Sequence, residues 1–170
     1  MNSFAQPLKS NAPLINRDRL WQSLMDLAQL GATAKGGVCR LALTDLDRQA
    51  RDLFVQWCEA AGCSVSVDAI GNIFARRAGR NPDLPPVMTG SHIDTQPTGG
   101  KFDGCYGVMA GLEVIRTLND LGVQTQAPIE VVVWTNEEGS RFPPCMMGSG
   151  VFAEKFTLAD TVAKVDVDGV

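Results

Sequence analysis

The chain has 170 residues, a formal net charge of −4 and an isoelectric point near 4.9. This length is sufficient for one domain with a sizeable core, and the acidic balance argues against a nucleic-acid partner, which would call for a basic face. No hydrophobic run approaches the ~20 residues of a membrane span, and the polar stretch over residues 1–13 does not resemble a secretory signal. We therefore expect no membrane partner, a flexible tail over residues 1–15 and a single domain over residues 16–170.

Five cysteines are present, an odd number without a C-x-x-C pair. This pattern fits neither a disulfide framework nor a cysteine zinc site, and we expect reduced thiols in a cytoplasmic protein. Cys105 and Cys145 lie near the acidic motifs described below, so a catalytic thiol remains an alternative. Such a nucleophile would require a histidine partner, and the single histidine, His92, has a better-supported use.

The N-terminal third of the chain predicts two amphipathic helices. Asn16 is placed to cap a helix over residues 17–30. Thr44 followed by Asp47 resembles a capping box that opens a helix over residues 45–61. The inward faces would carry Leu20, Leu24 and Leu27 in the first helix, and Leu46, Ala50, Leu53, Phe54 and Trp57 in the second.

Beyond residue 62 the hydrophobic period changes from that of helices to that of strands. Residues 63–68 alternate, and residues 72–77 are expected to pair with them as a hairpin. Residues 87–89 predict a short strand, residues 104–121 a helix, and the β-branched run 129–134 a strand buried on both faces. This order predicts an α/β fold with a mixed, mostly parallel sheet flanked by helices.

Acidic side chains follow two of these predicted strands. His92 and Asp94 come directly after one strand, and Glu137 and Glu138 after the other, while Asp103 comes from a glycine-rich loop. Ligands of open α/β sheets bind beyond the carboxyl ends of the strands, so both clusters are expected at a common cavity. A histidine nitrogen with several carboxylate oxygens suits Zn²⁺ or Mn²⁺.

The spacing of these residues suggests separate roles. One residue separates His92 from Asp94, so in extended backbone the Asp94 carboxylate would accept the imidazole N–H and fix its tautomer. His92 and Asp103 are candidate metal ligands, and of the adjacent Glu137 and Glu138 one could bind metal while the other takes a proton from metal-bound water. The residues alone leave open the plainer interpretation, a solvated glutamate pair and an ordinary glycine-rich turn.

Four segments together resemble the M20 metallopeptidase-like amidohydrolases, namely Gly90–Gly104, Gly107–Gly111, Trp134–Phe142 and Gly148–Gly150. Within that family the chain looks like the hydantoinase/carbamoylase branch, which includes N-carbamoyl-L-amino-acid hydrolase, β-ureidopropionase and allantoate amidohydrolase. The similarity extends from about Asn16 to the last residue. The segments 19–28 and 68–76 look most like bacterial N-carbamoyl-β-alanine amidohydrolases.

The resemblance implies a zinc-peptidase-like catalytic domain with two divalent metal ions, zinc or manganese, with cobalt and nickel as alternatives. It implies hydrolysis of the carbamoyl C–N bond of a small-molecule substrate, giving an amino acid, ammonia and carbon dioxide. N-carbamoyl-β-alanine is the first expectation, and allantoate or an N-carbamoyl-L-α-amino acid is the alternative. A homodimer is expected for a full-length member of this family.

The resemblance also implies roles for individual residues. His92 would hold one metal, Asp103 would bridge both and Glu138 would hold the other, with Asp94 orienting His92 and Glu137 as general base. Three further residues lie in family-like motifs and are expected to shape the substrate pocket: Gln96, Asn72 and Arg141.

The chain departs from the family in length. Family members are over twice as long and supply further metal-binding histidines and a dimerisation domain, whereas His92 is the only histidine here. A helix expected from Leu158 is followed closely by the last residue, Val170. We therefore expect residues 16–170 to form an incomplete catalytic domain, inactive alone and binding metal weakly. A non-catalytic domain that retains the motifs is the alternative from a different class.

Overall fold

The computed structural model describes residues 15–170. Residues 1–14 of the tail expected over residues 1–15 therefore lie outside the described residues. Within the described part the elements follow in the order α1 (Arg17–Leu27), α2 (Asp45–Ala60), β1 (Ser64–Val67), β2 (Ile73–Arg77), β3 (Val87–Ser91), α3 (Cys105–Asp120), β4 (Ile129–Val133), α4 (Met147–Phe152) and α5 (Leu158–Val162). Every strand expected from the sequence is present, and α4 is the one helix that the sequence patterns did not predict.

The four strands form one sheet in the order β1-β2-β4-β3. β1 pairs with β2 and β2 with β4 in antiparallel fashion, whereas β3 and β4 are parallel. The α/β class and the mixed sheet are confirmed, but the expectation of a mostly parallel sheet is corrected, because only one pairing in the described sheet is parallel. The short connection between β1 and β2 permits only a hairpin, while α3 provides the crossover that parallel β3 and β4 require.

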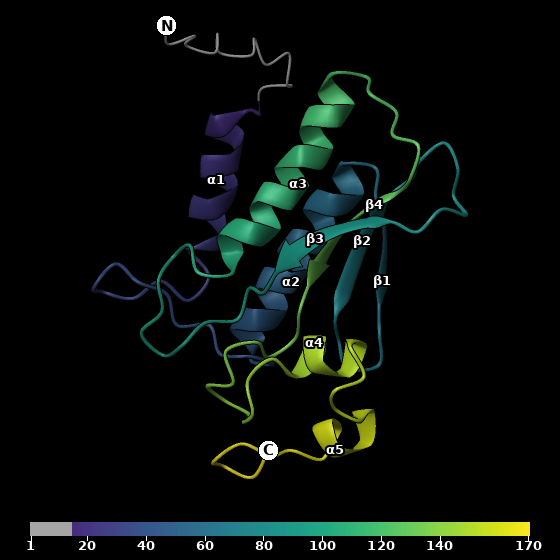
Figure 1. The fold of residues 1–170 in the computed structure, drawn as a ribbon. Coiled ribbons are helices and arrows are strands. Elements are labelled where there is room, and N and C mark those ends of the chain that lie inside the picture. The colour runs from purple at the N-terminus through teal and green to yellow at the C-terminus, as the bar shows by residue number, and fades with distance from the viewer. Residues whose placement is uncertain (1–14) are drawn as a thin grey trace, which may run out of the picture.

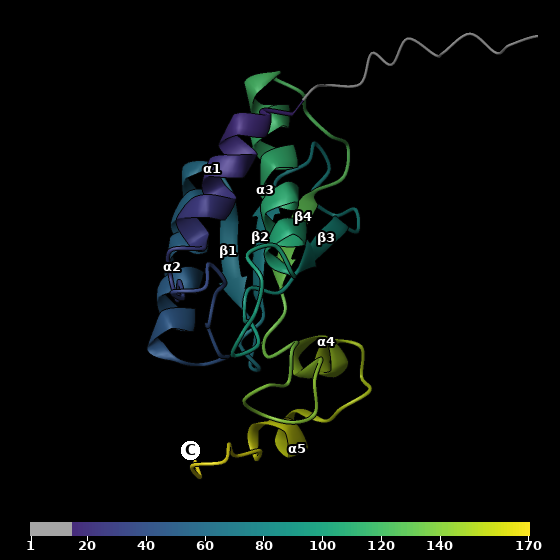
Figure 2. The ribbon, with the colours of Figure 1, turned by 90° about the vertical axis from the view of Figure 1, so that its left-hand side faces the viewer.

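One face of the sheet carries the core. Buried side chains of α1, α2 and α3 join those of β2 and β4 in a single cluster, and these three helices lie together beside the sheet in Figures 1 and 2. Ile73 pairs with Val133 and Ala75 with Val131, so these four side chains share the helix-covered face. α4 and α5 lie beyond one end of the sheet.

The helix starts follow the predicted caps. The Asn16 side chain accepts the N–H of Arg19 at 3.0 Å, and the Thr44 hydroxyl accepts the N–H of Asp47 at 3.3 Å. These bonds satisfy amide groups that have no partner inside their own helix. Both helix starts are therefore determined by residues close in the chain.

The helix ends and faces depart from expectation in two places. α1 ends at Leu27, three residues before the expected end at residue 30, and the Leu27 and Leu30 carbonyl oxygens both accept hydrogen bonds from Arg40 Nη1. In α2 the side chain of Leu46 points outward and is 38% exposed, whereas Cys58 is fully buried. The buried face of α2 is thus rotated from the predicted one.

The parallel pair β3–β4 brings the two acidic motifs to one edge of the sheet. Ser91 lies opposite Val133, and the Trp134 N–H donates to the Ser91 carbonyl oxygen at 2.8 Å. His92 therefore leaves β3 at the same edge as the residues that follow β4. Among residues 15–170, no helix is both long and apolar enough to cross a membrane.

Candidate active site

The imidazole of His92 is held in one orientation by the backbone. Its Nδ1 lies 2.9 Å from the carbonyl oxygen of Asp94, and the side chain is almost fully buried. A carbonyl oxygen only accepts, so Nδ1 carries a proton and donates it to this bond. In the neutral ring Nε2 is then left with a lone pair, which is the state that a metal ligand needs.

Two carboxylates approach this free nitrogen. Nε2 of His92 lies 3.2 Å from Glu137 Oε2 and 3.8 Å from Asp103 Oδ1. A lone pair and two carboxylates that face one another repel unless a proton or a metal ion lies between them. Nitrogen and carboxylate donors suit Zn²⁺ or Mn²⁺. The donor chemistry therefore fits a divalent cation, although among the described residues no group of three or more such side chains is arranged as a ready-made metal cluster.

Asp94 connects the two acidic motifs. Its Oδ1 accepts the Glu137 N–H at 3.3 Å and its Oδ2 accepts the Glu138 N–H at 3.2 Å, whereas Oδ1 is 3.7 Å from His92 Nδ1. Burial raises the pKa of the Asp94 carboxyl, and the imidazole and the two N–H groups oppose that rise.

The orienting bond to His92 expected from the Asp94 carboxylate is therefore made by the Asp94 backbone carbonyl. The physical reason is that β3 ends at Ser91, so residues 92–94 are not part of an extended strand. The carboxylate turns instead toward the two backbone donors after β4.

Glu138 and Gln96 form the outer part of the site. The Gln96 side-chain amide donates to Glu138 Oε2 at 3.0 Å. Gln96 is exposed, and the Asp103 side chain is 71% exposed. The structure thus brings His92, Asp94, Asp103 and Glu137 together, and it places Glu138 with Gln96 beside them.

Asn72 lies outside this cluster. Its Nδ2 donates to the Asp68 carboxylate at 2.8 Å and to the Gly148 carbonyl oxygen at 3.0 Å, and its Oδ1 accepts the Thr135 N–H at 3.0 Å. The side chain is fully buried. Substrate contact was expected of Asn72, but each of its polar atoms is already bonded within the protein, and the residue ties β2 to the segments that follow β4.

Arg141 is also engaged elsewhere. Its Nε donates to Asp166 Oδ2 at 2.8 Å, and its Nη1 donates to the carbonyl oxygens of Ala42 at 3.0 Å and Leu43 at 2.7 Å. The guanidinium also lies 4.8 Å from the ring centroid of Phe142. These bonds join three distant segments, and Arg141 also lines a pocket with Asp68 and Thr135, so its expected role in shaping the substrate pocket stays a prediction.

Two further residues support the site, of which Arg40 had no signal in the sequence patterns and Gly104 only closed the family-like segment Gly90–Gly104. Arg40 Nε donates to the carbonyl oxygen of Ile93 at 2.7 Å, directly between His92 and Asp94. Gly104 lies against the His92 ring, where an added Cβ would be 2.5 Å from Nε2. An arginine in a loop and a glycine before a helix are common, so only their tertiary contacts show what each does at the site.

Cys105 is poorly suited to act as a nucleophile beside His92. All five are free thiols, with Cys105 buried and Cys145 exposed. Cys105 Sγ accepts a hydrogen bond from Arg40 Nη2 at 3.2 Å, and burial raises the pKa of its thiol. A reactive cysteine needs a lowered pKa and access to solvent. The geometry therefore favours the metal-site interpretation over the thiol alternative.

Comparison with known proteins gives consistent relatives. Residues 88–169 match the family described as Peptidase family M20/M25/M40. The chain is 55% identical over 155 residues to N-carbamoyl-L-amino-acid amidohydrolase of Rhizobium meliloti, covering 91% of this chain and 37% of that relative. It is 36% identical over 167 residues to ureidoglycolate hydrolase of Arabidopsis thaliana, covering 98% of this chain and 34% of the relative.

The fold agrees with these relatives. A hydantoinase/carbamoylase family amidase from Burkholderia ambifaria superposes with a TM-score of 0.92 at 59% identity, covering 93% of this chain and 39% of that one. The amidase from Burkholderia multivorans gives the same TM-score at 64% identity. Residues 88–169 thus match peptidase family M20/M25/M40, within a chain whose sequence and fold are similar to those of hydantoinase/carbamoylase amidases over about two fifths of their length.

Proposed function

We propose that this chain contains the general base and some of the metal ligands of an amidohydrolase that acts on N-carbamoyl amino acids. The observation that carries the proposal is the position of His92 Nε2, which faces Glu137 at 3.2 Å and Asp103 at 3.8 Å at the carboxyl ends of parallel strands. Similarity to the relatives from Rhizobium meliloti and Geobacillus stearothermophilus, both N-carbamoyl-L-amino-acid amidohydrolases, supports the reaction class.

The proposed ligands are His92, Asp103 and Glu138, which would hold two divalent ions, zinc or manganese first and cobalt or nickel as alternatives. Asp103 would bridge the ions. When bound, such ions polarise the carbonyl oxygen and lower the pKa of water in the site. This chain carries one histidine. A complete two-ion site would therefore need further ligands from sequence that corresponds to the unmatched part of the relatives.

Glu137 is the proposed general base. Its Oε2 would take one proton from the attacking water and deliver it to the nitrogen that leaves the carbamoyl carbon. Water adds to the carbamoyl carbon and one C–N bond then breaks, which leaves a carbamic acid. The carbamic acid decomposes with cleavage of the second C–N bond, so one N-carbamoyl amino acid and one water give one amino acid, one ammonia and one carbon dioxide. Asp94 would position both glutamates, because its carboxylate accepts hydrogen bonds from the backbone N–H groups of Glu137 and Glu138.

The proposed substrates are N-carbamoyl amino acids, of the β or the α type. N-carbamoyl-β-alanine is expected from the sequence resemblance, and N-carbamoyl-L-α-amino acids are favoured by the names of several relatives. Ureidoglycolate is the second candidate class, because relatives from Arabidopsis thaliana and Oryza sativa carry that name. We also propose a cytoplasmic homodimer with residues 16–170 as part of its catalytic domain.

The test is made on the complete protein that carries this sequence, loaded with zinc or manganese. Glu137→Gln should lower kcat by about 10²–10⁴-fold, the usual contribution of a general base, while metal content stays unchanged. Glu59→Gln, a matched change on the exposed side of α2, should keep full activity. Release of ammonia from the four substrate classes, including allantoate, assigns the substrate. Normal turnover by Glu137→Gln would contradict the assignment of the base.

A further inference from the structure

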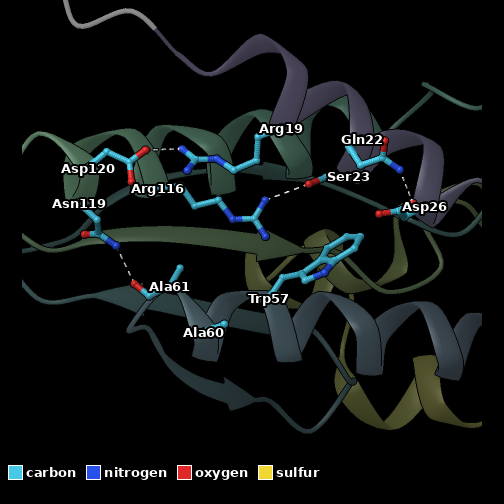
Figure 3. Close-up of a pocket in the computed structure, with 10 residues that line it drawn as sticks. All are labelled: Arg19, Gln22, Ser23, Asp26, Trp57, Ala60, Ala61, Arg116, Asn119 and Asp120. Carbon is cyan, nitrogen blue, oxygen red and sulfur yellow. Dashed lines mark hydrogen bonds and ion pairs between the residues drawn. The ribbon is translucent and has the colours of Figure 1, made fainter.

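A pocket lies between α1, α2 and α3 (Figure 3), and on α3 it is lined by residues near the end opposite Gly104 and the histidine site. Its volume is about 410 Å³, within the range of roughly 300–1,000 Å³ typical of small-molecule sites. Arg116 lies twelve residues after Gly104 on α3, which is roughly 18 Å along the helix. None of the pocket residues takes part in the His92 cluster.

Arg116 is the polar centre of this pocket. Its Nη1 donates to the Ser23 hydroxyl oxygen at 2.9 Å, and its guanidinium lies 5.8 Å from the ring centroid of Trp57. Among the described residues no carboxylate forms an ion pair with it, whereas Arg19 beside it contacts Glu113 and Asp120, each at 2.8 Å. Burial lowers the pKa of Arg116. A guanidinium has five N–H donors, so most of those on Arg116 have no protein partner in the described part of the chain.

Acidic groups flank this cation. Figure 3 shows the Arg116 guanidinium between the Arg19–Asp120 pair on one side and Ser23, Asp26 and the Trp57 ring on the other. Asp26 accepts the Gln22 amide through Oδ1 at 2.7 Å, and its second oxygen is available to a ligand. A doubly charged phosphate would be repelled by two carboxylates, whereas a carboxylate that carries its own ammonium group would match the pattern.

We propose that this pocket binds a free amino acid as its zwitterion. The ligand carboxylate would accept two hydrogen bonds from Arg116 in the bidentate arrangement that guanidinium groups favour. Its ammonium group would lie at Asp26, and its side chain would cover the Trp57 ring. The site is separate from the catalytic cluster and does not depend on the proposed function.

The test uses nuclear magnetic resonance titration of the isotope-labelled protein with three probes. L-leucine carries both charges, L-leucinamide lacks the carboxylate and 4-methylpentanoate lacks the ammonium group. L-leucine should shift the Trp57 indole and Ser23 amide signals, and each of the other probes should bind about tenfold more weakly or worse. Arg116→Gln should weaken L-leucine binding by about tenfold or more. Asp26→Asn should weaken L-leucine but leave 4-methylpentanoate unchanged.

Arg48→Gln is the matched control, because Arg48 is an exposed arginine on α2 outside the pocket; it should bind L-leucine normally. Ser23→Ala provides a second variant if Arg116→Gln does not fold. The proposal is overturned if L-leucine causes no shift at millimolar concentration, if inorganic phosphate binds as well as L-leucine, or if the shifts appear at the His92 loop instead. Because no catalysis is measured, these outcomes are independent of the activity assay.

Discussion

Arg40 donates a hydrogen bond from Nε to the carbonyl oxygen of Ile93 at 2.7 Å. Ile93 is the residue that separates His92 from Asp94. The Arg40 backbone also bonds to Thr95 in both directions, each bond at 2.8 Å. Arg40 is 1% exposed, and its Nη1 binds carbonyl oxygens at the end of α1. One buried side chain therefore fixes the histidine loop against the first helix.

Replacement of Arg40 tests this connection. Arg40→Lys keeps the charge but loses the planar set of donors, which leaves buried carbonyl oxygens without partners. We expect a loss of about 2–4 kcal/mol in the free energy of unfolding, measured by urea denaturation, together with weaker zinc binding. Arg48→Lys on the exposed face of α2 should change neither quantity. Unchanged stability and zinc affinity in Arg40→Lys would show that the loop is positioned by other contacts.

Gly104 determines how closely α3 approaches the imidazole. Its φ is +65°, and a Cβ would lie 2.5 Å from three atoms of the His92 ring. Gly104→Ala should therefore displace His92, with a conformational cost of about 1–2 kcal/mol and about tenfold weaker zinc binding by calorimetry. The control is Gly100→Ala in the same loop, where a Cβ meets no atom within 4 Å. Equal zinc affinities for the two variants would contradict this account of the ring position.

The ion pair of Arg19 with Glu113 makes stability depend on pH. Burial by itself raises the pKa of Glu113, but hydrogen bonds from Arg19, the Asn16 N–H and Thr117 outweigh it, and the net pKa is lowered. The lowered pKa means that this stabilisation is fully present above the pKa of the unfolded chain and is lost as the pH falls through the folded value.

Glu113→Gln should therefore show a weaker loss of stability on acidification than the unchanged protein, between about pH 5 and pH 3. Urea unfolding midpoints across that window provide the measurement. Glu59→Gln, an exposed glutamate on α2, should retain the original pH dependence. If Glu113→Gln and the unchanged protein lose stability in parallel, Glu113 does not contribute to acid sensitivity.

Asn72 offers a test of structural against substrate-binding roles. Asn72→Ala leaves the buried Thr135 N–H and Gly148 carbonyl oxygen without their partner, so unfolding should become easier by about 2–4 kcal/mol. Asn81→Ala, at an exposed turn where the side chain bonds to Asp83, should cost less than about 0.5 kcal/mol. A stable Asn72→Ala variant with a raised KM would restore the substrate-binding interpretation.

The sequence by itself determined the features that depend on neighbouring residues. Asn16 and Thr44 cap helices because their side chains reach amide groups three residues ahead. The β-branched run of β4 forms a buried strand, as its hydrophobic pattern predicts. Local geometry and hydrophobic period specify such features.

Only the tertiary structure decided which polar atoms meet across long sequence separations. The Asp94 carboxylate bonds to the amides of Glu137 and Glu138, while its carbonyl oxygen orients His92. Asn72 lies in a family-like motif, but its side chain is fully hydrogen-bonded within the protein. Arg40 supports the site from a loop that matches no recognisable sequence motif. The physical reason is that a buried polar group must find a partner wherever the fold supplies one, and residue spacing along the chain carries no information about that choice.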